Sequence, residues 1–150
     1  MLRFLFFLSV ICCFVLNPAL SIAGEITSPF GWRIHPISGE WSFHSGVDIG
    51  YDAGTPIGAL MDGVVFYSGI YEGYGNCVLL EHSSGDYTLY AHFERLAVRD
   101  GDNVSCGDII GYVGSTGVST GPHLHLEWWH DSEYMDPLGL IDRQKVCNSL

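Results

Sequence analysis

The chain has 150 residues, a length that suits one compact domain and leaves no room for a second domain of ordinary size. Hydrophobic residues make up 47% of the sequence, which is enough to form a core. The chain carries 17 acidic and 6 basic residues, so its net charge is −11. Nucleic acid is excluded as an expected partner, because phosphate binding requires clustered lysine and arginine.

The first 23 residues have the pattern of a secretory signal peptide. Arg3 precedes an apolar run over residues 4–16, and the small residues Ser21 and Ala23 lie just before the expected cleavage site. The apolar run is shorter than the roughly 20 residues that cross a bilayer, so an uncleaved anchor is the less favoured alternative and the only membrane contact that we expect. The sequence thus predicts an exported protein, periplasmic or extracellular, whose mature domain spans residues 24–150.

Turn signals rich in glycine and aspartate divide the rest of the chain into short segments. Between them lie runs rich in β-branched and aromatic residues, at 63–67, 77–80, 87–90, 109–113 and 124–128. No long window repeats its apolar residues every 3.6 positions, as an amphipathic helix would. The sequence therefore predicts an all-β, mostly antiparallel domain with hairpin connections.

Two histidine motifs lie far apart in this β-rich chain. Segment 43–48 reads FHSGVD and holds His44 and Asp48, and segment 123–125 reads HLH. Side chains on a strand alternate between its two faces, so His123 and His125 share one face and Leu124 takes the other. Imidazole and carboxylate groups that converge in this way suit divalent zinc, with one position left open for water.

Further short segments surround these motifs. They read SPFGWR at 28–33, YTLYAH at 87–92, GSTG at 114–117, TGPHLHLE at 120–127 and DPL at 136–138. In this order they resemble the lysostaphin-like, or LytM-type, zinc metallopeptidases, which cut the peptide cross-links of bacterial peptidoglycan. The resemblance covers nearly the whole chain after the leader, and it implies the LytM catalytic fold, a duplicated-hybrid-motif type of β domain.

Position by position, the resemblance implies that His44, Asp48 and His125 hold one zinc ion and that His92 and His123 are catalytic groups beside it. It implies a zinc endopeptidase that acts, as a monomer, on peptidoglycan stem peptides. Glycyl-glycine and D-alanyl-diaminopimelate bonds are both substrates within the family, and both stay open here. The alternative is a peptidoglycan-binding or amidase-activating domain without turnover, against which the five intact positions count.

Several other residues have two open interpretations. Alternation along 87–92 places Thr88, Tyr90 and His92 on one face, and Tyr90 and the hydroxyl-rich stretch 115–120 either bind the substrate backbone or serve only local structure. Five aromatic residues in loop-like segments are either groove walls or core, namely Trp32, Trp41, Phe43, Tyr71 and Tyr74.

Four further acidic or histidine residues lie in or near the motifs. Glu127 shares the face of the HLH histidines and either orients one of them or forms a salt bridge. We expect His35 to be structural or to line the groove, His82 to lie in a hairpin turn, and His130 to face solvent.

Cysteine usage gives one further prediction. Removal of the leader would leave Cys77, Cys106 and Cys147 in an oxidising compartment. One disulfide and one free thiol is the simplest state for three cysteines. Because Cys77 lies in the strand-like run 76–82, we favour a pair between the other two, and the alternative pairings stay open.

Overall fold

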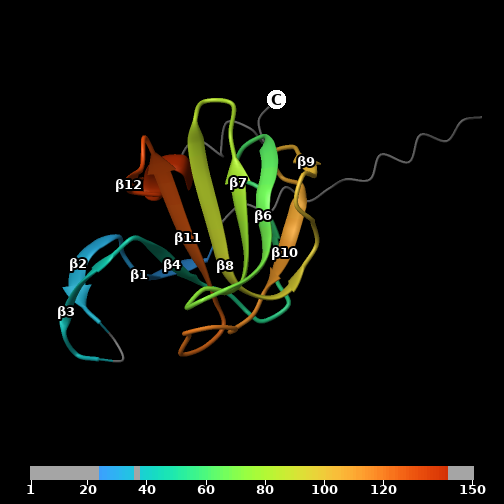
Figure 1. Ribbon diagram of the computed structural model, residues 1–150. Helices are drawn as coiled ribbons and strands as arrows, with labels where there is room; N and C mark the ends of the chain where they lie inside the picture. Colours follow the sequence, from blue (N-terminus) through green and yellow to red (C-terminus); the bar gives the residue numbers. More distant parts are fainter. Residues whose placement is uncertain (1–23, 36–37, 142–150) are drawn as a thin grey trace, which may run out of the picture.

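The computed structural model describes residues 24–35 and 38–141. The predicted signal peptide and Cys147 lie outside these residues. Figure 1 shows the chain as a curved sheet of strands with a small hairpin beside it. The strands are β1 (Glu25–Ser28), β2 (Gly31–Ile34), β3 (Trp41–His44), β4 (Gly46–Gly50), β5 (Pro56–Gly58), β6 (Gly63–Tyr71), β7 (Gly75–Glu81), β8 (Asp86–Leu96), β9 (Asn103–Val104), β10 (Ile109–Val113), β11 (His123–His130) and β12 (Glu133–Met135).

The prediction of an all-β, antiparallel domain is confirmed. Ten of these strands form one sheet whose main order is β1-β4-β11-β8-β7-β6-β9, and β2 and β3 form a separate pair. All strand pairs within the described part are antiparallel. The five predicted runs fall within β6, β7, β8, β10 and β11, because β-branched and aromatic side chains pack well on a pleated surface.

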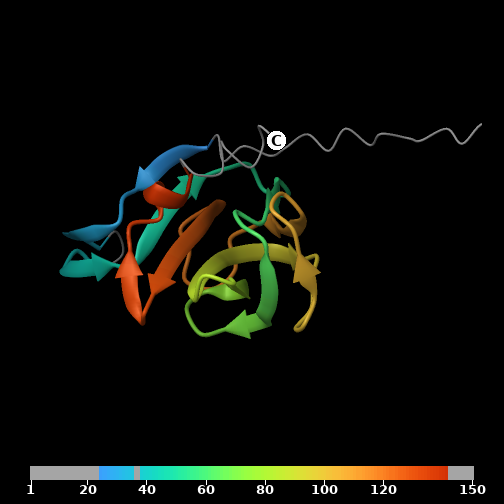
Figure 2. The same cartoon turned by 90° about the horizontal axis from the view of Figure 1, so that it is seen from above.

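Strand β8 connects the two parts of the sheet. It pairs with β11 and β7 along most of its length and with β10 near its end, so the sheet curves around one core, as Figure 2 shows from above. The core face carries fully buried apolar side chains from neighbouring strands, among them Ile49, Leu80, Phe93 and Leu126. Each such side chain contributes about 1.5–3 kcal/mol on burial, so this face holds the sheet in shape.

Segments 31–34 and 41–44 differ from the prediction that they are loop-like. They form the hairpin β2–β3, in which Trp32 pairs with Phe43 and Ile34 pairs with Trp41. These four large apolar side chains remain exposed on one face of the hairpin, and β2 and β3 have only four residues each. Their apolar residues do alternate, but a run of four residues is too short for this period to distinguish a strand from a loop.

The predicted alternation along β8 is wrong at His92. Thr88 and Tyr90 do face the core, but the register between β7 and β8 shifts after Tyr90, and His92 has a positive φ of 65°. Such a bulge inserts one extra residue and turns the following side chain to the opposite face. As a result, Phe93 returns to the core while His92 joins the face of Ala91.

Two remaining predictions concern cysteines and membranes. Cys77 is buried in β7, where burial raises the pKa of its thiol to about 11. The favoured pair of Cys106 with Cys147 involves a residue outside the described part and stays a prediction. Within residues 24–35 and 38–141, no helix has the length and apolar character needed to cross a bilayer.

Candidate functional site

The HLH segment behaves as alternation predicts. It begins β11, where Leu124 is fully buried in the core while His123 and His125 point to the other face of the sheet. Strand β4 runs antiparallel beside it and places Asp48 directly opposite His125. Two strands that are anchored by the core thus bring a carboxylate and an imidazole from distant parts of the sequence into contact.

A cluster of three donor atoms forms at this point. Asp48 Oδ1 lies 2.7 Å from His125 Nδ1 and 3.2 Å from His44 Nε2, and the two imidazole nitrogens are 3.2 Å apart. His44, at the end of β3, Asp48 and His125 are the one group of three or more His, Cys, Asp or Glu residues within the described residues whose ligand atoms lie close enough to hold a metal. These are the three residues for which the sequence predicted that role.

The second ring nitrogen of each clustered histidine is held away from the cluster. His44 Nδ1 donates to the Pro29 carbonyl at 2.9 Å, and His125 Nε2 donates to Glu127 Oε1 at 3.1 Å. A ring whose proton is fixed on one nitrogen presents a lone pair on the other. Both histidines are therefore oriented to offer their inner nitrogens to a cation.

Glu127 is fully buried and joins several donors. Its carboxylate accepts hydrogen bonds from Tyr74 Oη at 2.8 Å, from Trp129 Nε1 at 2.9 Å and from the Ser45 hydroxyl, in addition to His125. Burial would raise the pKa of Glu127, but these contacts outweigh it and the pKa is lowered. Both interpretations that the sequence left open apply, because the contact fixes one nitrogen of His125 and is a salt bridge when that ring is protonated.

The charges in the cluster stabilise one another. Burial opposes ionisation of Asp48, yet the hydrogen bond from His125 and the nearby ring of His44 hold the pKa of this carboxyl well below its usual range. Burial likewise lowers the pKa of His125, but hydrogen bonds to Asp48 and Glu127 outweigh it and raise the pKa to about 9. Without a cation, a proton on His125 therefore compensates one of the two negative charges on Asp48 and Glu127.

His92 and His123 lie beside the donor cluster with their ring centroids 4.7 Å apart. His92 Nδ1 donates to the Thr116 carbonyl and His123 Nδ1 donates to the Gly121 carbonyl, both at 2.8 Å. Each ring therefore presents Nε2 as an acceptor toward the centre, and His123 Nε2 is 3.8 Å from Asp48 Oδ1. Burial lowers the pKa of His92 to about 4, so this ring is neutral near pH 7.

Two glycines allow close contact between the loops around His92, including the loop that carries the Thr116 carbonyl. Gly75 and Gly117 have φ values of 66° and 74°, and their backbones touch. A Cβ on Gly75 would lie 2.4 Å from the Thr116 carbonyl carbon, which real structures do not tolerate. The contact joins the turn before β7 to the loop after β10, and the His92 N–H bonds to the Tyr74 carbonyl in that turn.

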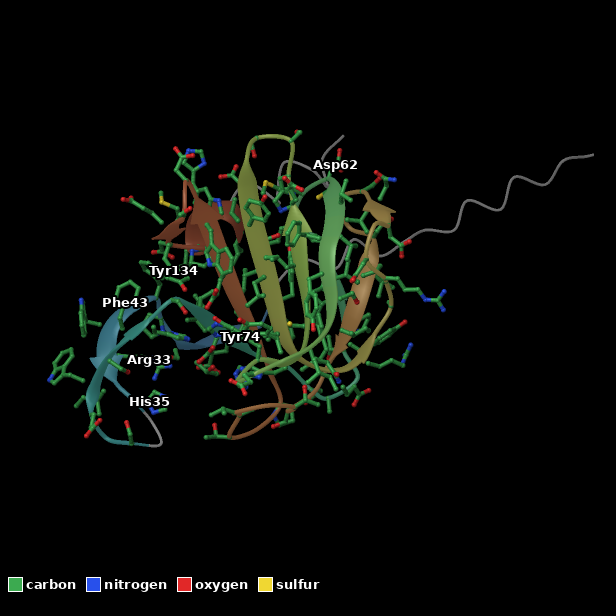
Figure 3. The ribbon with its side chains drawn as sticks, in the orientation of Figure 1. Arg33, His35, Phe43, Asp62, Tyr74 and Tyr134 are labelled. Carbon is green, nitrogen blue, oxygen red and sulfur yellow. The ribbon has the colours of Figure 1, made fainter. Side chains whose placement is uncertain are left out.

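A cavity of about 290 Å³ opens over the cluster. Its lining includes His123, Tyr74, Ser119 and Thr120, as well as Arg33 and His35 from the segment that contains β2. Figure 3 shows Arg33 and His35 on the hairpin side and Tyr74 across from them. The aromatic residue Tyr74 and part of the stretch 115–120 therefore do line the groove, as one open interpretation proposed.

Four other residues with open interpretations do not line this cavity. Tyr90 is fully buried in the core, where its hydroxyl accepts from the Leu60 N–H at 2.9 Å, so the structure favours the structural one of its two interpretations. Trp32 and Phe43 lie on the exposed face of the hairpin, opposite Arg33 in the β2 alternation. Trp41 shares that exposed face.

The remaining histidines have structural contacts. His82 is buried in the turn between β7 and β8, where its ring bridges the Asp62 carbonyl and the Thr88 hydroxyl. His130 is exposed, as expected, and its ring also contacts Asp86 at 2.8 Å. His35 bonds within its own turn through the Ser38 N–H and also lines the cavity.

The donor set fits a zinc ion. Zinc–nitrogen and zinc–oxygen bonds of about 2.0–2.2 Å in a tetrahedron place ligand atoms roughly 3.3 Å apart. Two of the three separations in the cluster are 3.2 Å, and the third, 2.7 Å, is that of a direct hydrogen bond between Asp48 and a protonated His125. Loss of that proton and a shift of a few tenths of an ångström would complete the geometry.

A β domain with two histidines and one aspartate converging beneath an open cavity has the site architecture of a metal-dependent hydrolase. Residues 42–137 match the family described as Peptidase family M23, and the chain belongs to that family. The match contains all five predicted site residues.

Individual proteins show the same relationship. The DD-carboxypeptidase/endopeptidase Mpg of Neisseria meningitidis serogroup B is 46% identical over 116 residues, which are 77% of this chain and 27% of that protein. The catalytic domain of lysostaphin from Staphylococcus simulans has a TM-score of 0.72 at 33% identity, covering 79% of this chain and 92% of that domain. A zinc-containing peptidase from Vibrio cholerae has a TM-score of 0.70 at 35% identity, with 75% of this chain and 35% of that chain covered.

Proposed function

We propose that the chain is a zinc-dependent endopeptidase that hydrolyses the peptide cross-links of bacterial peptidoglycan. The observation that carries the proposal is the convergence of His44, Asp48 and His125 beside two further histidines whose acceptor nitrogens face the same point. The relative Mpg, named for DD-carboxypeptidase and endopeptidase activity, supports the reaction class. The chain spans only about a quarter of that relative's length, 27%, so the activity is assigned here to the shared domain alone.

His44, Asp48 and His125 would hold one zinc ion. A zinc ion in such a site polarises the scissile carbonyl and lowers the pKa of water. Glu127 and the Pro29 carbonyl keep the two histidine rings in the orientation that metal binding requires. The cavity leaves one side of the cluster open to a peptide.

The two non-ligand histidines would handle the proton. The low pKa of His92, about 4, makes it a weak base that remains a neutral acceptor and orients the attacking water. We therefore assign the general base to His123, whose Nε2 would take the proton from water and pass it to the leaving amine. The carbonyls of Thr116 and Gly121 hold both rings in the tautomer that this requires.

The first experiment is mass spectrometry of soluble products from cross-linked peptidoglycan incubated with purified residues 24–150 and zinc. A chelator-treated sample and the His123→Ala variant serve as controls. New peptide fragments that vanish in both controls are the expected result, and their masses identify the bond that is cut. If all three samples are alike while the protein sediments with the wall, the chain is a binding or activating domain instead.

We further propose that the protein is exported to the periplasm or beyond, that residues 1–23 are its cleaved signal peptide, and that it acts as a monomer. The apolar leader sequence and its small residues before position 24 support export and cleavage. Expression of the full chain with a C-terminal tag tests this, since N-terminal sequencing should find Gly24 first. Recovery of an intact Met1 in the membrane fraction would favour an uncleaved anchor.

A further inference from the structure

Arg33 is the one lysine or arginine among the described residues that line the site. It lies in β2, faces away from the exposed aromatic side of the hairpin, and borders two adjoining cavities. The first is the cavity over the donor cluster, and the second, of about 390 Å³, lies next to it. Both are also lined by Asp48, Thr120 and His123, so they meet at the metal-site residues.

The guanidinium of Arg33 is not saturated with acceptors. Its Nη2 is 3.7 Å from Asp48 Oδ2, beyond hydrogen-bond distance, and its Nε is buried with no hydrogen-bond partner among the described residues. A buried donor without a partner is costly, and the cost is recovered when an acceptor arrives. Guanidinium groups pair best with planar, bidentate carboxylates. The side chain therefore has the capacity to bind one more anionic group beside the cluster.

The substrate chemistry offers such a group in one of the two bond types. In a D-alanyl-diaminopimelate bond, the carbon attached to the scissile nitrogen carries a free carboxylate, as does the last residue of a stem that ends in D-alanyl-D-alanine. Three covalent bonds separate that carboxyl carbon from the scissile carbonyl carbon, a span of at most about 4.3 Å. An internal glycyl-glycine bond has a neutral amide at the same place.

We propose that Arg33 binds a free carboxylate on the leaving amino acid and thereby selects substrates that carry one. The inference rests on the proposed function and specifies its substrate class. With the scissile carbonyl at the donor cluster, the carboxylate extends toward the second cavity, where Arg33 meets the hydroxyl-bearing residues Thr27 and Ser28. The domain is acidic and Glu72 also lines the first cavity, so an anionic group would be repelled at the site without a nearby cation. Arg33 supplies that positive charge.

The test uses two matched pairs of synthetic peptides. One pair ends in D-alanyl-D-alanine, as the free acid or the C-terminal amide, and the other is a cross-linked dimer whose diaminopimelate carboxylate is free or amidated. The zinc-loaded enzyme, Arg33→Gln, Arg33→Lys and the exposed control Arg99→Gln are compared by kcat/KM. The wild type and Arg99→Gln should prefer the free acids, and Arg33→Gln should lose about tenfold to a hundredfold on the acids alone. The two pairs separate a stem terminus from a cross-link as the source of the carboxylate.

A second measurement separates recognition from support of the metal ligand. Zinc affinity is measured by competition with a chelator, and peptide binding is measured calorimetrically on zinc-loaded His92→Ala with either Arg or Gln at position 33. Arg33→Gln should keep its zinc, and Arg33→Lys should restore part of the preference for the acid. Equal losses on acid and amide peptides, or weaker zinc binding in Arg33→Gln, would show that Arg33 only positions Asp48 and would overturn the proposal.

The calorimetric binding measurement separates failure of the proposed endopeptidase function from failure of the proposed carboxylate recognition by Arg33. If no peptide and no peptidoglycan is cleaved, the proposed function fails, whereas tighter binding of the acid that depends on Arg33 still supports carboxylate recognition. If peptidoglycan is cleaved but acid and amide bind and react alike, the proposed function stands and the role of Arg33 is rejected.

Discussion

At the scale of single residues, the site is organised by what each histidine does with its second nitrogen. His44, His92 and His123 donate to backbone carbonyls, whereas His125 donates to the carboxylate of Glu127. A carbonyl is fixed by the fold, but a side-chain acceptor can be changed by mutation. The contact between Glu127 and His125 is therefore the place where the orientation of a proposed ligand can be tested directly.

We expect Glu127→Gln to weaken zinc binding by about tenfold to a hundredfold, the usual effect of removing a carboxylate behind a metal ligand. Three donors besides His125 point at Glu127, and a Gln amide nitrogen would face at least one of them. Competition with a chelator measures the change, with the exposed Glu133→Gln as a matched control. An unchanged zinc affinity would mean that the fold alone orients His125.

The metal-free protein should lose stability in alkaline solution. The pKa of His125 is raised to about 9 from an unfolded value near 6.5, so its contribution is complete below pH 6.5 and is lost as the pH rises through 9. The loss amounts to at most about 3 kcal/mol. Urea unfolding of chelator-treated protein between pH 6 and 10 measures it, and His125→Asn should show a flatter profile. Parallel profiles for the two proteins would contradict the assignment.

At the scale of elements, the bulge in β8 decides which face His92 occupies. A regular strand would have placed the ring in the core beside Tyr90, as alternation predicted. The positive φ at this residue is strained for an L-amino acid and persists because the Tyr74 and Thr116 carbonyls hold its N–H and its ring. The strain is thus located at a residue that we propose to be catalytic.

At an ordinary strand position a glycine variant is less stable than an alanine variant, and at this bulge we expect the opposite order. His92→Ala and His92→Gly both lose the imidazole, but only Ala retains a Cβ at a φ of 65°. We expect His92→Gly to be the more stable variant by about 1 kcal/mol, because left-handed backbone costs L-residues that much. Denaturant unfolding of the two zinc-free variants provides the comparison. A more stable Ala variant would show that the bulge relaxes once the ring is gone.

The sequence could predict those parts of the fold and site that follow from periodicity. Alternation in the HLH segment placed Leu124 in the core and both histidines on the opposite face, because β11 is regular there. The same rule failed at His92, since a bulge depends on pairing between β7 and β8 and not on local residue types. The hairpin β2–β3 could not be predicted because its strands have only four residues each, and the position of Arg33 beside Asp48 depends on that hairpin.

At the scale of the whole molecule, the net charge of −11 should cause electrostatic repulsion from the anionic cell wall that we propose as the substrate. Exposed charges interact over a Debye length of about 10 Å at 0.1 M salt, and the repulsion weakens as salt is added. We expect cleavage of whole peptidoglycan to accelerate severalfold between 10 and 150 mM salt, and cleavage of a short uncharged peptide to stay constant. A turbidity assay and a peptide assay at matched salt concentrations measure this. Equal slopes for both substrates would show that salt acts on catalysis itself.

The strands that form the site lie far apart in the sequence. His44 and His125 are 81 positions apart, and Asp48 and His125 are 77 apart, yet each pair is in contact. Closing such long loops delays folding, because the entropy of closure is lost before the contacts that compensate it can form. A chain of which only the first hundred residues have emerged holds two of the proposed ligands, His44 and Asp48, but lacks His125. The proposed metal site would therefore be complete only once β11 has paired with β4.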